Sequence, residues 1–175
     1  MTREPFPWRK LTPAQIDLIE RLVTADGALA YDRLEYRELL ALSELQKLGF
    51  VDTGVKGRRK LEVYLTPAGR ELQAQAYVTE QIVLRVTGPQ IDFMRGLLDS
   101  PIDDRVGLPM SEFMGIMYDI CRRMVLRGWV EWYERWDGRR CAKLTPAGRE
   151  VLAAVGALDQ TVIQFDEVRR RRGLL

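Results

Sequence analysis

Arginine is the side chain whose number and spacing in this sequence point most clearly to chemistry. Of the 27 basic residues, 22 are arginine. Lys56, Arg58, Arg59 and Lys60 fall close together, and four consecutive arginines occupy positions 169–172. A guanidinium presents a planar fork of N–H donors that matches phosphate oxygens and the edge of guanine. The first cluster therefore predicts local contacts with nucleic-acid phosphates, whereas the C-terminal run is more typical of a solvated tail.

The sequence contains few of the residues that catalysis or metal binding requires. The chain has no histidine and two cysteines, which excludes Ser-His or Cys-His catalysis and most zinc sites. Phosphate-binding glycine loops and dinucleotide fingerprints are missing from the sequence as well. We therefore expect no enzyme activity, no cofactor and no metal. Cys121 falls on an apolar helical stripe and is expected to be buried and inert, while Cys141 is expected in a strand, where it could be exposed.

Size and composition limit the class of protein. The chain has 175 residues, a net charge of +2 and 46% hydrophobic residues, enough for one ordinary domain or two small ones. It has no apolar run long enough to span a bilayer, and Arg3, Glu4, Pro5 and Pro7 are unlike a signal peptide. Two cysteines cannot staple a secreted mini-domain. We therefore expect a cytoplasmic protein.

An internal repeat organises the chain. The seven residues from Leu65 to Glu71 recur unchanged from Leu144 to Glu150. At the same spacing, Gly49-Phe50-Val51 corresponds to Gly128-Trp129-Val130. Ordered matches of this kind are typical of a duplicated domain.

Each copy predicts the same order of elements. Thr12 and Pro13 are a helix cap and a first helical residue, and a second helical segment ends at Gly49, where glycine suits a left-handed cap. Apolar and polar residues then alternate up to Leu65, which predicts a two-stranded hairpin. In the second copy, Asp137-Gly138 is a hairpin turn signal.

This order predicts two winged helices. We expect a mostly α chain with small β-hairpins, made of two tandem winged helix-turn-helix domains at residues 1–87 and 88–175. They are joined by a helix that starts at Thr66 and runs to about Val86, before the Thr87-Gly88-Pro89 breaker.

The end of each copy resembles MarR-type bacterial transcriptional regulators. That pattern has a leucine four positions before a glycine, an arginine-rich wing and an L-T-x-x-G-R tail. The matching residues in the first copy are Leu45, Gly49, Arg58, Arg59, Leu65, Thr66, Gly69 and Arg70. Those in the second are Met124, Gly128, Arg139, Arg140, Leu144, Thr145, Gly148 and Arg149. The resemblance implies a winged-helix fold and DNA binding, and the chain differs from the family in carrying two copies.

The fold then assigns candidate DNA contacts. Outward positions of the two expected recognition helices are Arg33, Tyr36, Arg37, Ser43, Glu44 and Lys47, and Tyr118, Asp119, Arg122, Arg123 and Arg127. Of these, Arg33, Tyr36, Arg37, Lys47, Tyr118, Arg122 and Arg123 are the candidates for base or phosphate contact. The two wings add Lys56, Arg58, Arg59 and Lys60, and Arg135, Arg139, Arg140 and Lys143.

We therefore predict a regulator of transcription that binds double-stranded DNA with two winged helices on one chain. Homodimerisation could occur through the N-terminal residues Phe6 and Trp8 or through the helix from Val151 to Phe165. The alternative is a winged-helix module that binds protein segments in a chromosome- or polymerase-associated complex. A third interpretation is a ligand-responsive regulator with a pocket between helices, for which the sequence offers no polar constellation. Independently of these alternatives, the exposed helical arginines could belong to a solvated face with neighbouring glutamates.

Overall fold

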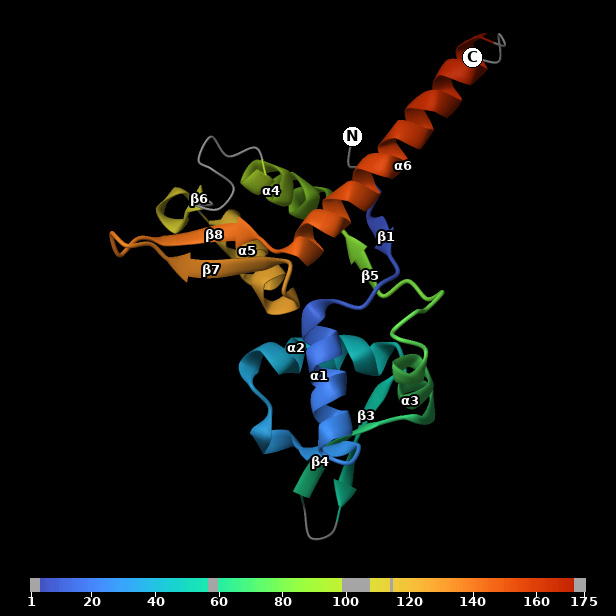
Figure 1. Cartoon of the computed structure of the whole chain (residues 1–175), viewed down its shortest axis with the longest axis vertical. Coiled ribbons are helices and arrows are strands. Elements are labelled where there is room, and N and C mark those ends of the chain that lie inside the picture. The colour runs from blue at the N-terminus through green and yellow to red at the C-terminus, as the bar shows by residue number, and fades with distance from the viewer. Residues whose placement is uncertain (1–3, 57–59, 99–107, 114, 172–175) are drawn as a thin grey trace.

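The computed structural model describes residues 4–56, 60–98, 108–113 and 115–171 and contains two halves with the same order of elements (Figure 1). The first half consists of α1 (Pro13–Thr24), β2 (Ala28–Ala30), the 3₁₀ turn η1 (Tyr31–Arg33), α2 (Tyr36–Lys47), β3 (Val51–Lys56), β4 (Lys60–Leu65) and α3 (Pro67–Ala74). The second half repeats this order with α4 (Gly88–Leu98), β6 (Leu108–Pro109), η2 (Met110–Glu112), α5 (Ile116–Arg127), β7 (Val130–Glu134), β8 (Arg140–Leu144) and α6 (Pro146–Arg171).

Helices and small antiparallel sheets both contribute to the fold. The sheets have strand orders β2-β4-β3 and β6-β8-β7, so each expected hairpin gains a third strand from the segment before η1 or η2. The expectation of a mostly α chain with hairpins alone was therefore incomplete. Short strands such as Ala28–Ala30 carry no strong pattern of their own, and pairing with β4 creates them.

The helix starts and ends follow the residues that predicted them. The Thr12 side chain accepts a hydrogen bond from the Gln15 N–H, and the Gln15 side chain accepts one from the Thr12 N–H, which forms a capping box. Gly49 and Gly128 have φ angles of 77° and 80°, the left-handed conformation that ends a helix and favours glycine.

The threonines after the two hairpins have identical roles. The hydroxyls of Thr66 and Thr145 accept from the N–H groups of Gly69 and Gly148 and donate to the carbonyls of Gly49 and Gly128. Each threonine therefore ties the start of one helix to the end of another.

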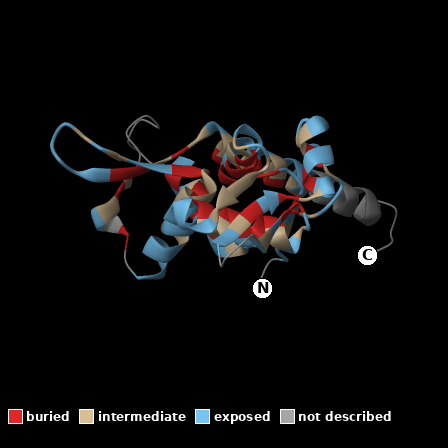
Figure 2. Ribbon diagram, turned by 90° about the horizontal axis from the view of Figure 1, so that it is seen from below, coloured by how far each residue is buried: buried red, intermediate tan, exposed pale blue. Residues whose placement is uncertain are grey.

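Two buried clusters fill the two halves (Figure 2). The first includes Leu18, Leu22, Leu45 and Val63, and the second is built around Met94, Met124, Trp129 and Val151. Figure 2 shows the buried residues, in red, concentrated along the inner sides of the helices and strands. Because the residues of both clusters are largely removed from water, hydrophobic burial is the main stabilising contribution in each half.

The helix predicted to start at Thr66 begins there, but its predicted extension to about Val86 was wrong. Helix α3 ends at Ala74, and Ala76 and Tyr77 have positive φ angles of 52° and 64°. The Tyr77 N–H bonds back to the Leu72 carbonyl at 2.9 Å, so the helix closes in a tight turn. No apolar helical stripe continues beyond Leu72, and the residues that follow reach a strand instead.

That strand connects the halves in an unpredicted way. Strand β5 (Leu84–Val86) pairs antiparallel with β1 (Phe6–Trp8). Trp8 packs edge-on against Trp129, with ring centroids 6.2 Å apart, and both rings belong to the second cluster. The N-terminal strand therefore stabilises the second half before the chain enters α1 of the first half.

Helix α6 continues well past the second cluster and projects from the body of the molecule (Figure 1). Val151 and Val155 are buried, and Leu158 is about half exposed. The predicted dimerisation residues Val162 and Phe165 lie where side chains are not described. In the part of the chain that is described, no helix is both long enough and apolar enough to cross a membrane.

Candidate nucleic-acid interface

The candidate recognition helix of the first half begins later than predicted. Arg33 lies in η1, outside α2, because Leu34 and Glu35 are extended and the Glu35 and Glu38 side chains form a capping box at the start of the helix. Arg21 donates hydrogen bonds to Glu38 and to the Arg33 carbonyl, so it fixes the turn against the helix. The hydrogen bond from Arg21 to Glu38 raises the pKa of the guanidinium.

The remaining α2 candidates are exposed but not equivalent. Tyr36, at the start of the helix, is 62% exposed. Arg37 forms an ion pair with Asp17 at 2.6 Å, and Lys47 is exposed at the last turn. An exposed pair such as Arg37–Asp17 contributes little to stability and leaves the arginine accessible.

Helix α5 supplies Tyr118, Arg122 and Arg123, all of them exposed. The Tyr118 ring stacks on Trp132 of β7, with centroids 6.0 Å apart. The Arg122 guanidinium lies 5.2 Å from the centroid of the Tyr36 ring and also donates a hydrogen bond to its hydroxyl. Arg122 and Tyr36 therefore join the two candidate helices directly.

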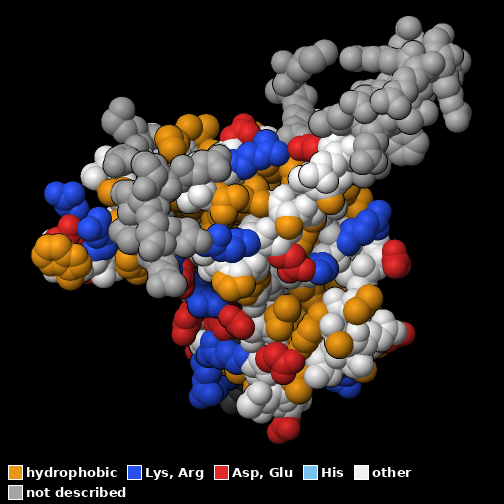
Figure 3. All heavy atoms as spheres, turned by 45° about the horizontal axis from the view of Figure 1, so that its top comes forward, with side chains coloured by type: hydrophobic (Ala, Val, Ile, Leu, Met, Phe, Trp, Pro, Cys, Tyr) orange, Lys and Arg blue, Asp and Glu red, His pale blue; other side chains and the backbone are white. Residues whose placement is uncertain are grey.

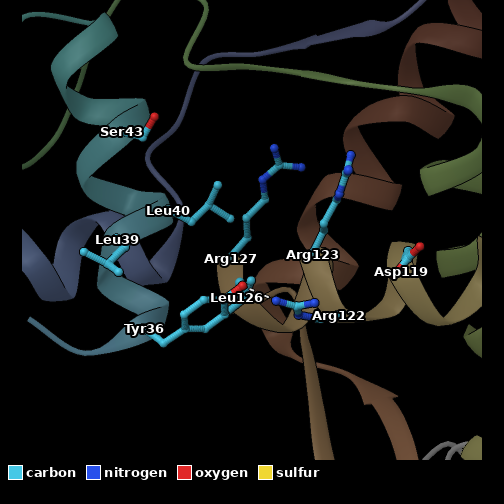
Figure 4. A pocket seen from close by; sticks show the side chains of 9 residues that line it. All are labelled: Tyr36, Leu39, Leu40, Ser43, Asp119, Arg122, Arg123, Leu126 and Arg127. Carbon is cyan, nitrogen blue, oxygen red and sulfur yellow. Dashed lines mark hydrogen bonds between the residues drawn. The ribbon is translucent and has the colours of Figure 1, made fainter.

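The outward faces of α2 and α5 are turned toward each other. A pocket of about 570 Å³ lies between them, lined by Tyr36, Leu39, Leu40, Ser43, Asp119, Arg122, Arg123, Leu126 and Arg127 (Figure 4). Figure 4 shows Leu40 pointing from α2 toward the Arg127 side chain, with Arg123 extending beside it and Tyr36 meeting Arg122 at one end.

Glu44 and Arg127 were predicted to face solvent, and this was wrong. Their side chains are 10% and 14% exposed, and Glu44 Oε1 accepts from Arg127 Nη2 at 2.9 Å and from Arg127 Nε at 3.2 Å. Glu44 Oε2 accepts from Gln15 Nε2 at 2.8 Å. Each of the two side chains points away from the buried cluster of its own half, and the opposite half covers it. Sequence could not indicate this because the contact joins positions 83 residues apart.

The hairpins differ in how free their basic residues are. In the second, Arg139 and Arg140 are both exposed, and Arg139 Nε lies 3.7 Å from Asp137 Oδ2. Arg135 is half-buried, with its Nε 3.9 Å from Asp137 Oδ1, and Lys143 pairs with Glu131 at 2.8 Å. In the first hairpin, Lys60 is exposed. Arg58 and Arg59 lie outside the described residues, and Lys56 ends β3 with its side chain likewise outside the description.

The end of the second hairpin combines positive charge with exposed aromatic surface. Gly138 has a φ of 75°, and the Gly138 N–H bonds to the Arg135 carbonyl, as expected for the predicted Asp137-Gly138 turn. Trp136, next to this turn, is 93% exposed. Figure 3 shows basic side chains in blue and hydrophobic ones in orange close together at the left end of the molecule, where Figure 1 places this hairpin.

The two cysteines are buried. Cys121 lies in the second cluster, and its Sγ accepts a hydrogen bond from Trp132 Nε1 at 3.1 Å. Burial raises the pKa of the Cys121 thiol to about 11. Cys141 lies in a strand, as expected, but the exposure that the sequence allowed is not found. The residue is fully buried in β8, the central strand of its sheet, where it pairs with Pro109 and Tyr133.

The proposed N-terminal dimer contact does not fit the structure. Trp8 is 5% exposed and contributes to the second cluster of its own chain, with Phe6 packed beside it. A buried ring cannot also serve as an exposed docking group. Homodimerisation through the helix from Val151 to Phe165 stays a prediction.

Sequence reasoning missed the facing arrangement of α2 and α5. The available signal was apolar residues outside the core stripes: Leu39 and Leu40 on α2, and Leu126 on α5. An isolated recognition helix has no need of such side chains at outward positions, so they indicated a second packing surface.

Comparison with known proteins provides no family assignment: no protein-family model, curated protein sequence or solved structure matches this chain.

Proposed function

We propose that this chain binds double-stranded DNA through two winged-helix halves and regulates transcription by occupying its site. The observation that carries the proposal is the repeated order of helix, strand, turn, helix and hairpin, with sheet orders β2-β4-β3 and β6-β8-β7. Each sheet thus extends into a hairpin whose sequence is rich in lysine and arginine. Basic groups at such positions suit contacts with the phosphate backbone or the minor groove.

The facing helices restrict how DNA could be bound. Major-groove reading needs an outward helical face, and the outward faces of α2 and α5 line one shared pocket. We therefore assign the main contacts to the hairpins, together with exposed residues at the edge of the helix pair. Tyr36, Tyr118 and Arg122, with Trp132, line a second hollow of about 330 Å³ at that edge. Because the exposed residues of the first half differ from those of the second, a single chain would prefer a DNA site whose two halves have different sequences.

The test is fluorescence anisotropy of a labelled random-sequence duplex titrated with the full chain at about 50 and about 200 mM salt. Binding through phosphates releases counterions, so the affinity should fall steeply as salt rises. The double variant Arg139→Ala/Arg140→Ala should weaken binding to every sequence and flatten the salt dependence, and so should Arg58→Ala/Arg59→Ala.

The matched control is Arg70→Ala/Arg85→Ala, which removes two exposed arginines from α3 and β5. It lowers the net charge by the same amount but leaves both hairpins intact. The assignment of DNA contacts to the hairpins would be contradicted if both hairpin variants bound DNA as tightly as the wild type. It would also be contradicted if the control variant lost as much DNA affinity as the hairpin variants. The absence of binding at low salt would remove DNA binding as the function of the isolated chain.

A second candidate is binding of a protein partner. The observation that favours it is the exposed aromatic surface of the second hairpin, where Trp136 is 93% exposed beside Arg135. Tryptophan and arginine are enriched among the residues that dominate protein interfaces. Trp136→Ala should leave folding unchanged but abolish association with such a partner, as measured by co-purification from cells that express the wild-type or the variant chain.

A further inference from the structure

The pocket between α2 and α5 is not needed for the proposed DNA binding. Both halves contribute to its lining, and its size falls in the range of small-molecule sites in proteins. Its three arginines, Arg122, Arg123 and Arg127, come from a single face of α5.

Positive charge exceeds negative charge around this space. The lining includes one carboxylate, that of Asp119. Glu44 stands behind Arg127, where its two oxygens already accept hydrogen bonds from Arg127 and Gln15. Three guanidinium groups therefore face two carboxylates, one of which is already engaged. This balance favours an anion.

Two of the arginines have unused hydrogen-bonding capacity. Arg123 is exposed and forms no ion pair with any described residue. Arg127 uses Nε and Nη2 for Glu44, while its Nη1 is buried and has no hydrogen-bond partner among the described residues. A buried donor without an acceptor is destabilising, and a ligand oxygen reached by a small side-chain movement would relieve this.

The remaining lining is apolar. Leu40 from α2 and Leu126 from α5, together with Leu39, expose aliphatic surface to the same space. An inorganic ion alone would leave this surface in contact with water. A ligand with a hydrophobic body would cover it and gain binding free energy from the burial.

We propose that this pocket binds a small organic anion, in which a phosphate or carboxylate group on an apolar or aromatic body bridges α2 and α5. The oxyanion contacts Arg123 and Arg127, and the body rests on Leu40 and Leu126. A DNA duplex cannot occupy the same position, because the pocket lies between two helices that contact each other through Tyr36 and Arg122. The proposal stands independently of DNA binding, since the ligand would bind to the chain alone.

Four probes separate the contribution of the anionic group from that of the hydrophobic body. They are phenyl phosphate, benzoate, inorganic phosphate and phenol, each titrated into the full chain by isothermal calorimetry. Tryptophan fluorescence gives a second readout, because the Arg127 guanidinium lies 5.5 Å from the centroid of the Trp129 ring. Phenyl phosphate or benzoate should bind at one site per chain and more tightly than inorganic phosphate or phenol. The stronger of the two shows whether the natural ligand is a phosphate ester or a carboxylate.

The diagnostic variant is Arg123→Gln, which removes an exposed charge without disturbing the Glu44–Arg127 pair. It should weaken binding of the preferred anion by about tenfold or more, because a charge-assisted hydrogen bond is lost. The control Lys47→Gln removes an exposed charge from α2 outside the pocket lining and should leave binding unchanged. The proposal is overturned if neither organic anion binds saturably, if phenol binds as well as phenyl phosphate, or if the two variants have equal effects.

Discussion

Replacing Glu44 by glutamine should destabilise the contact between the two halves. The carboxylate accepts three hydrogen bonds, two from Arg127 and one from Gln15, with both partners of the ion pair largely buried. Glutamine keeps the shape but removes the charge, so the Arg127 guanidinium would remain buried without a counterion. Breaking a fully buried pair costs about 3–5 kcal/mol, and the residual exposure of these side chains places the expected loss near the low end, about 3 kcal/mol.

A double-mutant cycle isolates the interaction. Arg127→Met removes the charge and keeps an apolar chain of similar length over Trp129. Each single variant should lower the free energy of unfolding, while the double variant should lose about 1.5–3 kcal/mol less than the sum of the two, because neither charge is then left unpaired. The control is Asp17→Asn, which breaks the exposed pair with Arg37 and should cost less than about 1 kcal/mol.

Urea unfolding followed by tryptophan fluorescence measures these values. The fluorescence reports mainly on the second half, where Trp8, Trp129, Trp132 and Trp136 lie, so circular dichroism should be recorded in parallel. Noncoincident transitions in Glu44→Gln, where the wild-type transitions coincide, would indicate that the halves have uncoupled. The reasoning is refuted if Glu44→Gln changes the free energy of unfolding by less than about 0.5 kcal/mol, or if the two single effects simply add.

Two further predictions concern the small residues and the thiols. A Cβ atom at Gly69 would lie 2.0 Å from the Phe50 carbonyl oxygen, and one at Gly148 would lie 2.1 Å from the Trp129 carbonyl oxygen, so alanine at either position should destabilise its half by about 3 kcal/mol. Gly156→Ala, in the open middle of α6, should instead stabilise the chain by about 0.5–1 kcal/mol. The same urea unfolding experiment measures all three glycine variants, and a gain in stability at Gly69 or Gly148 with a loss at Gly156 would contradict the close packing. Because burial raises the pKa of Cys121 to about 11, the reactive thiolate is scarce at pH 8 and becomes abundant only as the pH approaches that value. A disulfide reagent should therefore label no thiol rapidly in the native chain at pH 8 and both thiols in denaturant, whereas fast native labelling would show that a cysteine is accessible.

The sequence alone determined most of the local structure. Thr12, Thr66 and Thr145 predicted where helices begin, because a threonine hydroxyl can satisfy an unpaired N–H in the first turn. Gly49 and Gly128 predicted where helices end, since glycine adopts positive φ without strain. These signals depend on a few neighbouring residues, so they can be read without knowledge of the rest of the chain. The repeat extended each prediction from one copy to the other.

The tertiary structure decided how these elements meet. Pairing of β1 with β5, burial of Cys141 and the contact between Glu44 and Arg127 each join segments or faces whose neighbours the local sequence does not specify. A period of two or of 3.6 residues shows which residues share a face, but not which distant element covers it. The outward faces of α2 and α5 were therefore predicted as faces, and only the assembled chain turned them toward each other to enclose a pocket. Local conformational preferences act over a few bonds, whereas this arrangement depends on burial between parts of the chain that are far apart in sequence.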